Sequence, residues 1–421
     1  MSTITHPPLR TSPPPALGLG PTPPIISPPL SPPTRLTSLD AYRGFVMILM
    51  ASEVTRLSRV ASGIKTPRWQ FIAHHTDHVP WTGCSLWDLI QPSFMFIVGV
   101  ALPFSLASRR AKGQSFGRML FHALWRSFLL IWLGIYLRSV GRSQLNFTFE
   151  DVLTQIGLGY TFLFLLAWLK PRYQALAAAL ILFAYWLAFA LYPLPPAGFN
   201  YASVGVPADW PHHLHGFAAH WDKNTNFAAR ADQWFLNLFP RPKRFIYNAG
   251  GYLSLSFIPS LATMILGMLA GNHLRCTMRS PTRKALNLLL AGLAFLVFGF
   301  TLDRLGICPI VKRIWTPAWT IFAAGWTCVL LSAFYAVIDI GGLRAWSFPL
   351  IVVGMNSIAM YFLAHPPLQP AVREAIQLHF PDKTFTLFGQ PYAPLVQGTL
   401  VLLTLWLICL WMYRRKIFLR I

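Results

Sequence analysis

Charged side chains lie inside or at the ends of two apolar stretches near the start of the chain. The first stretch, 39–55, carries Asp40, Arg43 and Glu53, and Asp88 lies at the start of the second, 86–107. A charge at the centre of a membrane helix costs about 2.5–3.5 kcal/mol on insertion scales, so such residues are normally retained for a function. These four residues are therefore candidates for binding or catalysis.

A polar loop between the two stretches contains His74, His75, Asp77 and His78. Histidine titrates near neutral pH, so it suits the removal of a proton from an amine or a hydroxyl group. Asp88 follows His78 by ten residues and could orient its imidazole, or could instead pair with Arg43 or Arg126. We expect His74 and His75 to be solvated loop residues.

Several motifs follow one another in a fixed order. The first motif contains Arg35, Ser38, Asp40, Arg43 and Gly44. His78 then precedes Trp81-Thr82-Gly83, which is followed by Asp88-Leu89-Ile90-Gln91-Pro92-Ser93-Phe94-Met95-Phe96-Ile97-Val98-Gly99. The later motifs are VLTQIG at 152–157, IWTPAW at 314–319, and VGMNSI at 353–358, which is followed by Tyr361 and His365. This series resembles the catalytic domain of the heparan-alpha-glucosaminide N-acetyltransferase family, including bacterial members, in the transmembrane acyltransferase superfamily. The resemblance covers about 35–421.

The resemblance implies transfer of an acetyl group from cytoplasmic acetyl-CoA to an extracytoplasmic amino sugar. The family's catalytic histidine corresponds to His78, which would act as general base with Asp88 beside it. Direct transfer is our default, and a transient acetyl-histidine stays open. One departure is that the family's Asp-Pro-Glu-Gly-Leu-Leu-Ser is replaced by residues 248–254, which lack both carboxylates, so the acceptor stays undefined.

Donor-binding residues are expected on two helices. Asp40 and Arg43 could seat CoA at the cytoplasmic mouth, or could simply neutralise each other three residues apart. Asn356, Ser357 and His365 lie on the ninth expected helix, where Asn356 could donate a hydrogen bond to the thioester carbonyl or to the pantetheine amides. Alternatively, Asn356 could join two helices by a hydrogen bond.

Composition indicates a polytopic membrane protein. Hydrophobic residues make up 54% of the 421 residues, charged residues only 11%, and the mean hydropathy is +0.48. We expect an all-α fold, with about ten transmembrane helices in one bundle of the transmembrane acyltransferase type. The expected helices are 39–55, 86–107, 119–137, 152–169, 174–193, 252–270, 285–302, 317–338, 347–364 and 394–413.

The distribution of Lys and Arg predicts the orientation. The loops on the side of the termini hold 15 basic residues in 45 positions, whereas the opposite loops hold 16 in 141. The positive-inside rule therefore predicts that both termini are cytoplasmic, in a multi-pass protein of the bacterial inner membrane. The long loop 194–248 would be extracytoplasmic, in a transmembrane acyltransferase domain spanning 36–421.

The proline content, the net charge and the cysteines bear on the N-terminal tail, on nucleic-acid binding and on metal binding. Residues 1–35 contain twelve prolines, which predicts a disordered cytoplasmic tail. The net charge of +22 has no accompanying nucleic-acid motif, so we expect no nucleic acid partner. The five cysteines show no metal-ligand spacing, and a disulfide between Cys84 and Cys308 is only one option beside free buried thiols. We expect no metal.

Two other functions stay open. A helical bundle with charges inside the membrane would also suit a sugar or glycoconjugate permease, which should require no thioester. A structural scaffold would leave the charged helices unexplained. The expected partners are acetyl-CoA, an amino sugar or glycan acceptor and the lipid bilayer, and a homodimer is an open alternative.

Overall fold

The computed structural model of the protein describes residues 36–419. The tail expected at 1–35 lies outside these residues. The described part is helical, and its β-structure is limited to one isolated bridge between Thr82 and Val311. This confirms the expectation of an all-α membrane protein.

Seven helical segments in the described part are long and apolar enough to cross a membrane. Three of them are single helices, namely α5 (Phe116–Ser139), α7 (Pro171–Ala190) and α10 (Pro281–Arg304). The other four spans are Trp87–Ala111, Ser254–Arg275, Pro317–Ile340 and Gln390–Arg414. They contain, in this order, α4 (Ile90–Ala111), α9 (Phe257–Arg275), α11 (Pro317–Phe334) with the π-helix η7 (Tyr335–Ile340), and α16 (Ala393–Arg414). An eighth span results if α12 (Phe348–Met355) and α13 (Ser357–Leu363), which meet at a bend of 73°, are counted as one.

The expected count of about ten transmembrane helices is therefore too high by this criterion. The two missing helices are α1 (Thr37–Ala51) and α6 (Val152–Leu166), each of 15 residues. At a rise of 1.5 Å per residue each is about 22 Å long, against a hydrocarbon core of about 30 Å. Helix α1 passes directly into the 3-10 helix η1 (Ser52–Thr55), and Arg56 then turns the chain with a φ of 51°.

The other helices are short and lie in the connections. The α-helices are α2 (Leu57–Ile64), α3 (Pro67–His75), α8 (Phe227–Phe235), α14 (Leu368–His379) and α15 (Asp382–Phe385). The 3-10 helices are η2 (Trp87–Leu89), η3 (Tyr201–Val204), η4 (Gly216–Trp221), η5 (Leu236–Leu238), η6 (Ser254–Ser256), η8 (Ala345–Ser347) and η9 (Gln390–Tyr392).

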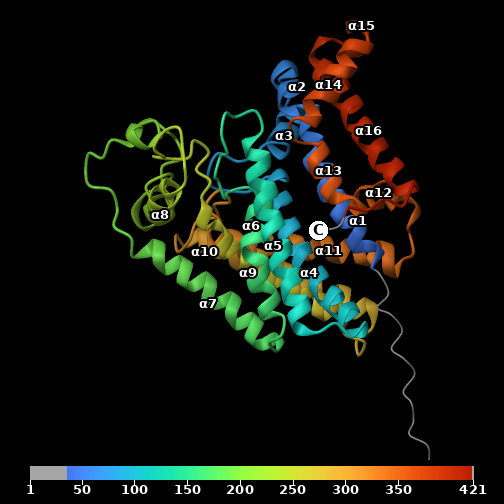
Figure 1. Cartoon of the computed structure of the whole chain (residues 1–421). Coiled ribbons are helices and arrows are strands. Elements are labelled where there is room, and N and C mark those ends of the chain that lie inside the picture. The colour runs from blue at the N-terminus through green and yellow to red at the C-terminus, as the bar shows by residue number, and fades with distance from the viewer. Residues whose placement is uncertain (1–35, 420–421) are drawn as a thin grey trace, which may run out of the picture. The chain divides into compact units, whose positions relative to one another are not determined.

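The centre of the bundle is built on close contact between α4 and α9. A Cβ atom at Gly99 of α4 would collide with the backbone oxygen of Met264 on α9, so only glycine permits this approach. Helix α6 packs against α9 and α4, and α5 packs against α6 (Figure 1). Buried side chains from these helices, such as Met95, Ile156 and Ile265, share one apolar core. The packing gives the helix ends a fixed frame.

Several helices begin at the same end of this frame. The Asp151 side chain accepts a hydrogen bond from Leu153 N and caps α6, and the Thr316 side chain accepts one from Trp319 N and caps α11. Pro317 then occupies the first turn of α11, where its missing N–H leaves no bond unmade. These N-caps fix where α6 and α11 begin, and the polar loops that precede the two helices lie at the same end of the bundle.

Candidate active site

Three titratable side chains meet where these loops converge. His78 Nδ1 lies 2.9 Å from Asp88 Oδ1. Lys312 Nζ lies 3.2 Å from the same Asp88 oxygen and 3.1 Å from His78 Nδ1. Asp88 and Lys312 are buried, whereas the His78 side chain is 37% exposed. The histidine is therefore the accessible member of the group.

The second oxygen of Asp88 is fully engaged. Its Oδ2 accepts hydrogen bonds from Val79 N at 3.3 Å, Ser85 N at 3.0 Å and Ser85 Oγ at 3.0 Å. A carboxyl group surrounded by donors acts as an ionised acceptor. Burial lowers the pKa of the Lys312 ammonium group, and the adjacent Asp88 carboxylate opposes that shift. Asp88 and Lys312 thus form a buried ion pair.

This pair determines which nitrogen of His78 can act as a base. The Nδ1 atom has one site for a hydrogen bond, and the acceptor Asp88 Oδ1 favours a proton on it. The Lys312 ammonium then donates to the same carboxylate oxygen. The lone pair of the ring is left on Nε2, which is the arrangement of a general base oriented by a carboxylate.

Loop-to-loop contacts hold the three residues together. The bridge between Thr82 and Val311 is supported by a hydrogen bond of 3.0 Å from Gly83 N to Ile310 O. Arg313 donates to Gly250 O at 2.7 Å and to Val79 O at 3.2 Å. One arginine therefore joins the histidine loop to the loop that precedes α9.

A tight turn presents Lys312. Trp315 N donates to Lys312 O at 2.9 Å, and Thr316 N donates to Val311 O at 3.1 Å. Trp315 has a φ of 51°, which is unusual for a bulky residue, but it is buried and its indole donates to Thr263 Oγ1 at 3.2 Å. Burial of the indole thus stabilises the turn.

The exposed side of His78 borders a cavity of about 210 Å³. Other ionisable residues also line it, namely Glu53, Arg138, Glu150, Tyr252, Tyr361 and His365. Lys312 also contributes to the lining. The apolar side chains of Met50 and Phe94 also line the cavity. It can therefore hold a small polar group next to a less polar group of a ligand.

A hydrogen-bond network around the buried Asp151 adjoins the same cavity. Arg138 Nε donates to Asp151 Oδ2 at 3.1 Å, and the Tyr361 hydroxyl donates to Asp151 Oδ1 at 3.2 Å. His365 Nδ1 lies 2.7 Å from Tyr361 O, and the two rings stack with centroids 4.3 Å apart. This network orients α13 relative to α6.

Glu150 differs from Asp151 because no cation among residues 36–419 forms an ion pair with it, whereas Asp151 pairs with Arg138. Its Oε2 accepts a hydrogen bond from the Asn248 side-chain amide. Burial raises the pKa of Glu150 to about 7, although the charge of Arg138 opposes the shift. Glu150 is thus a carboxyl group that titrates near neutral pH in the same cavity as His78.

The structure brings together only some of the expected site residues. His78 and His365 line this cavity, and the buried Asp88 contacts His78. Asp40 and Arg43 do not line it: they pair with each other at 3.4 Å near the start of α1, about 10–15 Å along the helix from Met50 at the cavity. The direct contact of Asp88 with His78 and Lys312 decides against its pairing with Arg43 or Arg126.

Asn356 and Ser357 lie at the bend between α12 and α13, outside the lining of the cavity. Asn356 is buried, and its Oδ1 accepts a hydrogen bond of 3.3 Å from Leu419 N. Its Nδ2 has no hydrogen-bond partner among the described residues. The bend therefore presents an unused amide donor inside the bundle.

Lys312 and Glu150 were missed as site residues in the sequence. Each directly precedes a recognised motif: Lys312 and Arg313 stand just before IWTPAW, and Glu150 and Asp151 before VLTQIG. A charged pair at the start of an apolar helix, next to a helix cap, was the available signal. Tyr252 and Arg138 carried no such signal.

Several other histidines in the described part have structural partners. His213 pairs with Asp222 at 2.8 Å, and His220 Nδ1 lies 2.8 Å from Tyr192 O. Between residues 36 and 419 no group of three or more His, Cys, Asp or Glu could hold a metal ion. All five cysteines, including Cys84 and Cys308, are free thiols. A disulfide between those two is therefore excluded in this structure.

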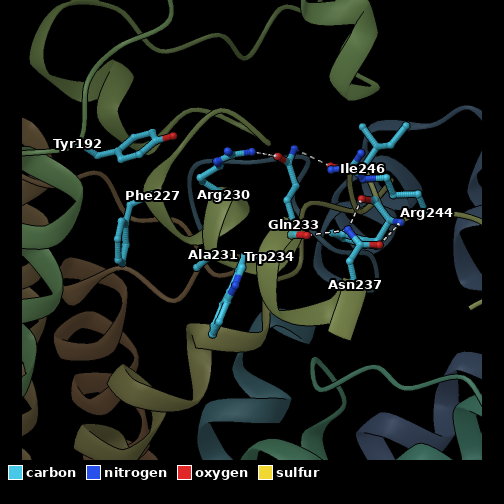
Figure 2. Close-up of a pocket in the computed structure, with 10 residues that line it drawn as sticks. Tyr192, Phe227, Arg230, Ala231, Gln233, Trp234, Asn237, Arg244 and Ile246 are labelled. Carbon is cyan, nitrogen blue, oxygen red and sulfur yellow. Dashed lines mark hydrogen bonds between the residues drawn. The ribbon is translucent and has the colours of Figure 1, made fainter. Parts of the chain in front are cut away.

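A larger cavity of about 570 Å³ lies over the long loop 194–248 (Figure 2). Its lining includes the rings of Tyr192, Phe227 and Trp234 and the guanidinium groups of Arg230 and Arg244. It has no histidine and no carboxylate, so it lacks a general base at neutral pH. The smaller cavity at His78 is therefore the better candidate for chemistry.

Comparison with known proteins gives two informative relatives. The chain is similar to the heparan-alpha-glucosaminide N-acetyltransferases of Homo sapiens, at 26% identity, and Mus musculus, at 25% identity. Each match covers 92% of this chain, which spans about 60% of the length of each relative. No protein-family model matches the chain. The resemblance drawn from the sequence motifs is thus confirmed.

Proposed function

We propose that the chain is a membrane-embedded acyltransferase that moves an acetyl group from cytoplasmic acetyl-CoA to an amino sugar on the other side of the membrane. The observation that carries this proposal is the accessible His78, oriented by the buried Asp88–Lys312 pair at a polar cavity. The similarity to two enzymes named N-acetyltransferases supports the reaction type.

His78 acts in this reaction as the general base. The amine nitrogen attacks the thioester carbonyl carbon, a C–N bond forms and the C–S bond breaks. His78 Nε2 takes a proton from the attacking nitrogen, and the departing CoA thiolate is protonated to the thiol. Asp88 accepts the hydrogen bond from Nδ1–H and stabilises the imidazolium that forms. Lys312 keeps Asp88 in place and partly offsets its charge.

Donor binding belongs to the opposite end of the bundle. Helices α4 and α9 begin at the site and end at Arg109, Arg110 and Arg275. A helix of 22 residues spans about 33 Å, so this basic end is on the far side of the membrane from His78. Arginine suits the phosphates of CoA, which exists in the cytoplasm.

The residues between the two ends would hold the extended part of the donor. Arg43 lies on α1, about 10 Å along the helix from Met50 at the cavity, and the Asn356 amide lies at the bend between α12 and α13. We assign Asp40 and Arg43 to the mouth of the donor path, and Asn356 and Ser357 to its middle. His365 belongs to the cavity itself. Both termini are then cytoplasmic, as in a multi-pass protein of the bacterial inner membrane.

The test is incubation of the purified full-length protein, in lipid nanodiscs, with acetyl-labelled CoA and a panel of amino sugars. The proposal expects labelled N-acetyl sugar and free CoA in equal amounts. To distinguish a permease from an acyltransferase, uptake of labelled sugar into sealed vesicles is measured in the absence of acetyl-CoA. Sugar uptake with no acetyl-CoA consumption would overturn the proposed acyltransferase function and indicate a sugar transporter.

A further inference from the structure

The cavity at His78 contains a second group that can accept a proton, and the reaction described above does not use it. Glu150 lines the same cavity as His78. Its carboxylate is held by the Asn248 amide, a neutral donor, and not by an arginine or a lysine. A carboxylate with a fixed orientation and no direct cation is suited to bind a cation supplied by a ligand.

The charged side chains near the Glu150 carboxylate have other partners. Arg138 is engaged with Asp151, which also accepts from Tyr361. Asp232 on α8 accepts from Ser254 N at 2.9 Å, and burial raises the pKa of Asp232 to about 6. The titratable and charged groups that act on Glu150 are Arg138, Asp151, Asp232, Arg241 and Tyr252. The only other carboxylate in the cavity lining is Glu53, whose side chain is exposed.

The number of protons in the reaction distinguishes two acceptor classes. A primary amine near neutral pH is largely an ammonium ion, since an α-amino group, for example, has a pKa of about 8. It must lose one proton before attack, to free its lone pair, and a second during attack. A hydroxyl acceptor loses a single proton. His78 can take one of these protons, and Glu150, a carboxylate fixed by the Asn248 amide in the same cavity, can take the other; Glu53 and His365 also line the cavity.

We propose that Glu150 binds the ammonium group of the amino-sugar acceptor and takes its first proton. This inference rests on the proposed acyltransferase function. The ammonium donates to the Glu150 carboxylate, which becomes a neutral carboxylic acid as the free amine forms. The amine then attacks the thioester, and His78 takes the second proton. One proton is returned to the CoA thiolate and the other is released to water.

The test compares the wild type with Glu150→Gln and Glu150→Asp, using glucosamine and glucose as acceptors that differ by one amino group. Glu150→Gln should raise KM for glucosamine at least tenfold at pH 7, with acetyl-CoA affinity unchanged. The defect should shrink at pH 9, where the amine is already free. Glu150→Asp should restore part of the affinity. Glucose should be a poor acceptor for all three proteins.

Two controls separate a binding role from damage to the fold. Glu374→Gln, an exposed carboxylate on α14, should behave as the wild type. Calorimetric binding of glucosamine without acetyl-CoA should weaken in Glu150→Gln and persist in Glu374→Gln. An unchanged KM, binding constant and pH profile in Glu150→Gln, with an active wild type, would overturn the role of Glu150 alone. No transfer by the wild type to any amino sugar would overturn this inference and the proposed function together.

Discussion

Lys312 Nζ and Asp88 Oδ1 lie 3.2 Å apart in the interior, although their loops precede different helices far apart in the chain. Both side chains are buried, at 5% and 1% exposure. Removing one member of such a pair leaves the other as an uncompensated charge, which is far more costly than the net contribution of the pair. The pair therefore makes the geometry around His78 sensitive to both residues.

Replacing Lys312 by Met should destabilise the protein by about 3–5 kcal/mol, because Asp88 loses its buried cation. Loss of the cation beside His78 should also move the acid limb of the pH–rate profile to higher pH. Thermal unfolding in detergent and rate measurements from pH 5 to 9 check both effects. Lys383→Met on the exposed surface of α15 is the matched control. A Lys312→Met protein as stable as this control would mean that the ion pair does not form.

Replacing Asp88 by Asn should lower the rate of acetyl transfer by about 10²–10⁴-fold. The amide can donate to Nδ1 and so favours the tautomer in which Nε2 carries the proton and cannot act as a base. Acetyl-CoA affinity should change little. The measurement is kcat and the dissociation constant of acetyl-CoA in parallel. A loss confined to acetyl-CoA affinity would remove Asp88 from the catalytic pair.

Replacing Arg43 by Ala should weaken CoA binding at least tenfold while the acceptor KM stays within about twofold. The reason is that phosphates need charge-assisted donors on the cytoplasmic face. Equilibrium binding of CoA, at two salt concentrations, measures the effect. Arg118→Ala, an exposed cation at the start of α5, is the comparison. Equal CoA affinity in Arg43→Ala and wild type would exclude Arg43 from the donor site, with the acyltransferase itself unaffected.

Replacing Glu150 by Gln should stabilise the protein at high pH and not at low pH. The pKa of Glu150 is about 7 in the folded chain against 4.5 for an ordinary glutamate, so the folded state holds this proton longer than the unfolded state. Ionisation therefore destabilises the fold as the pH rises from 4.5 to 7. The stability difference between the variant and the wild type should be near zero at pH 3.5 and roughly 1–3 kcal/mol at pH 8. A difference independent of pH would contradict the shifted carboxyl group.

The sequence was sufficient for the class of fold and for the contact between His78 and Asp88. Apolar length and the loop charges indicate a helical membrane protein, and the spacing from His78 to Asp88 is short enough for one loop to join them. The count of about ten helices is not supported because α6 is apolar but only 15 residues long, and because α1 with the adjoining η1 carries Asp40, Arg43 and Glu53. The ends of both helices depend on the turn at Arg56 and on tertiary caps, which hydropathy does not report.

The rest of the site depends on contacts between distant loops. Lys312 reaches His78 only because the turn at Trp315 and the bridge at Thr82 place two loops side by side. Glu150 reaches the cavity because α5 and α6 pack together and Asn248 holds its carboxylate. No local pattern encodes such contacts, so residues like Lys312 could be suspected from charge but not placed.

The most direct test of the account is the rate of acetyl transfer to glucosamine by His78→Ala, measured with labelled acetyl-CoA. A general base contributes about 10²–10⁴-fold, so the variant should lose at least that much while it still binds acetyl-CoA and unfolds at the wild-type temperature. His74→Ala, on α3 outside the cavity, should keep most of the activity. Near-normal transfer by a folded His78→Ala protein would contradict the mechanism.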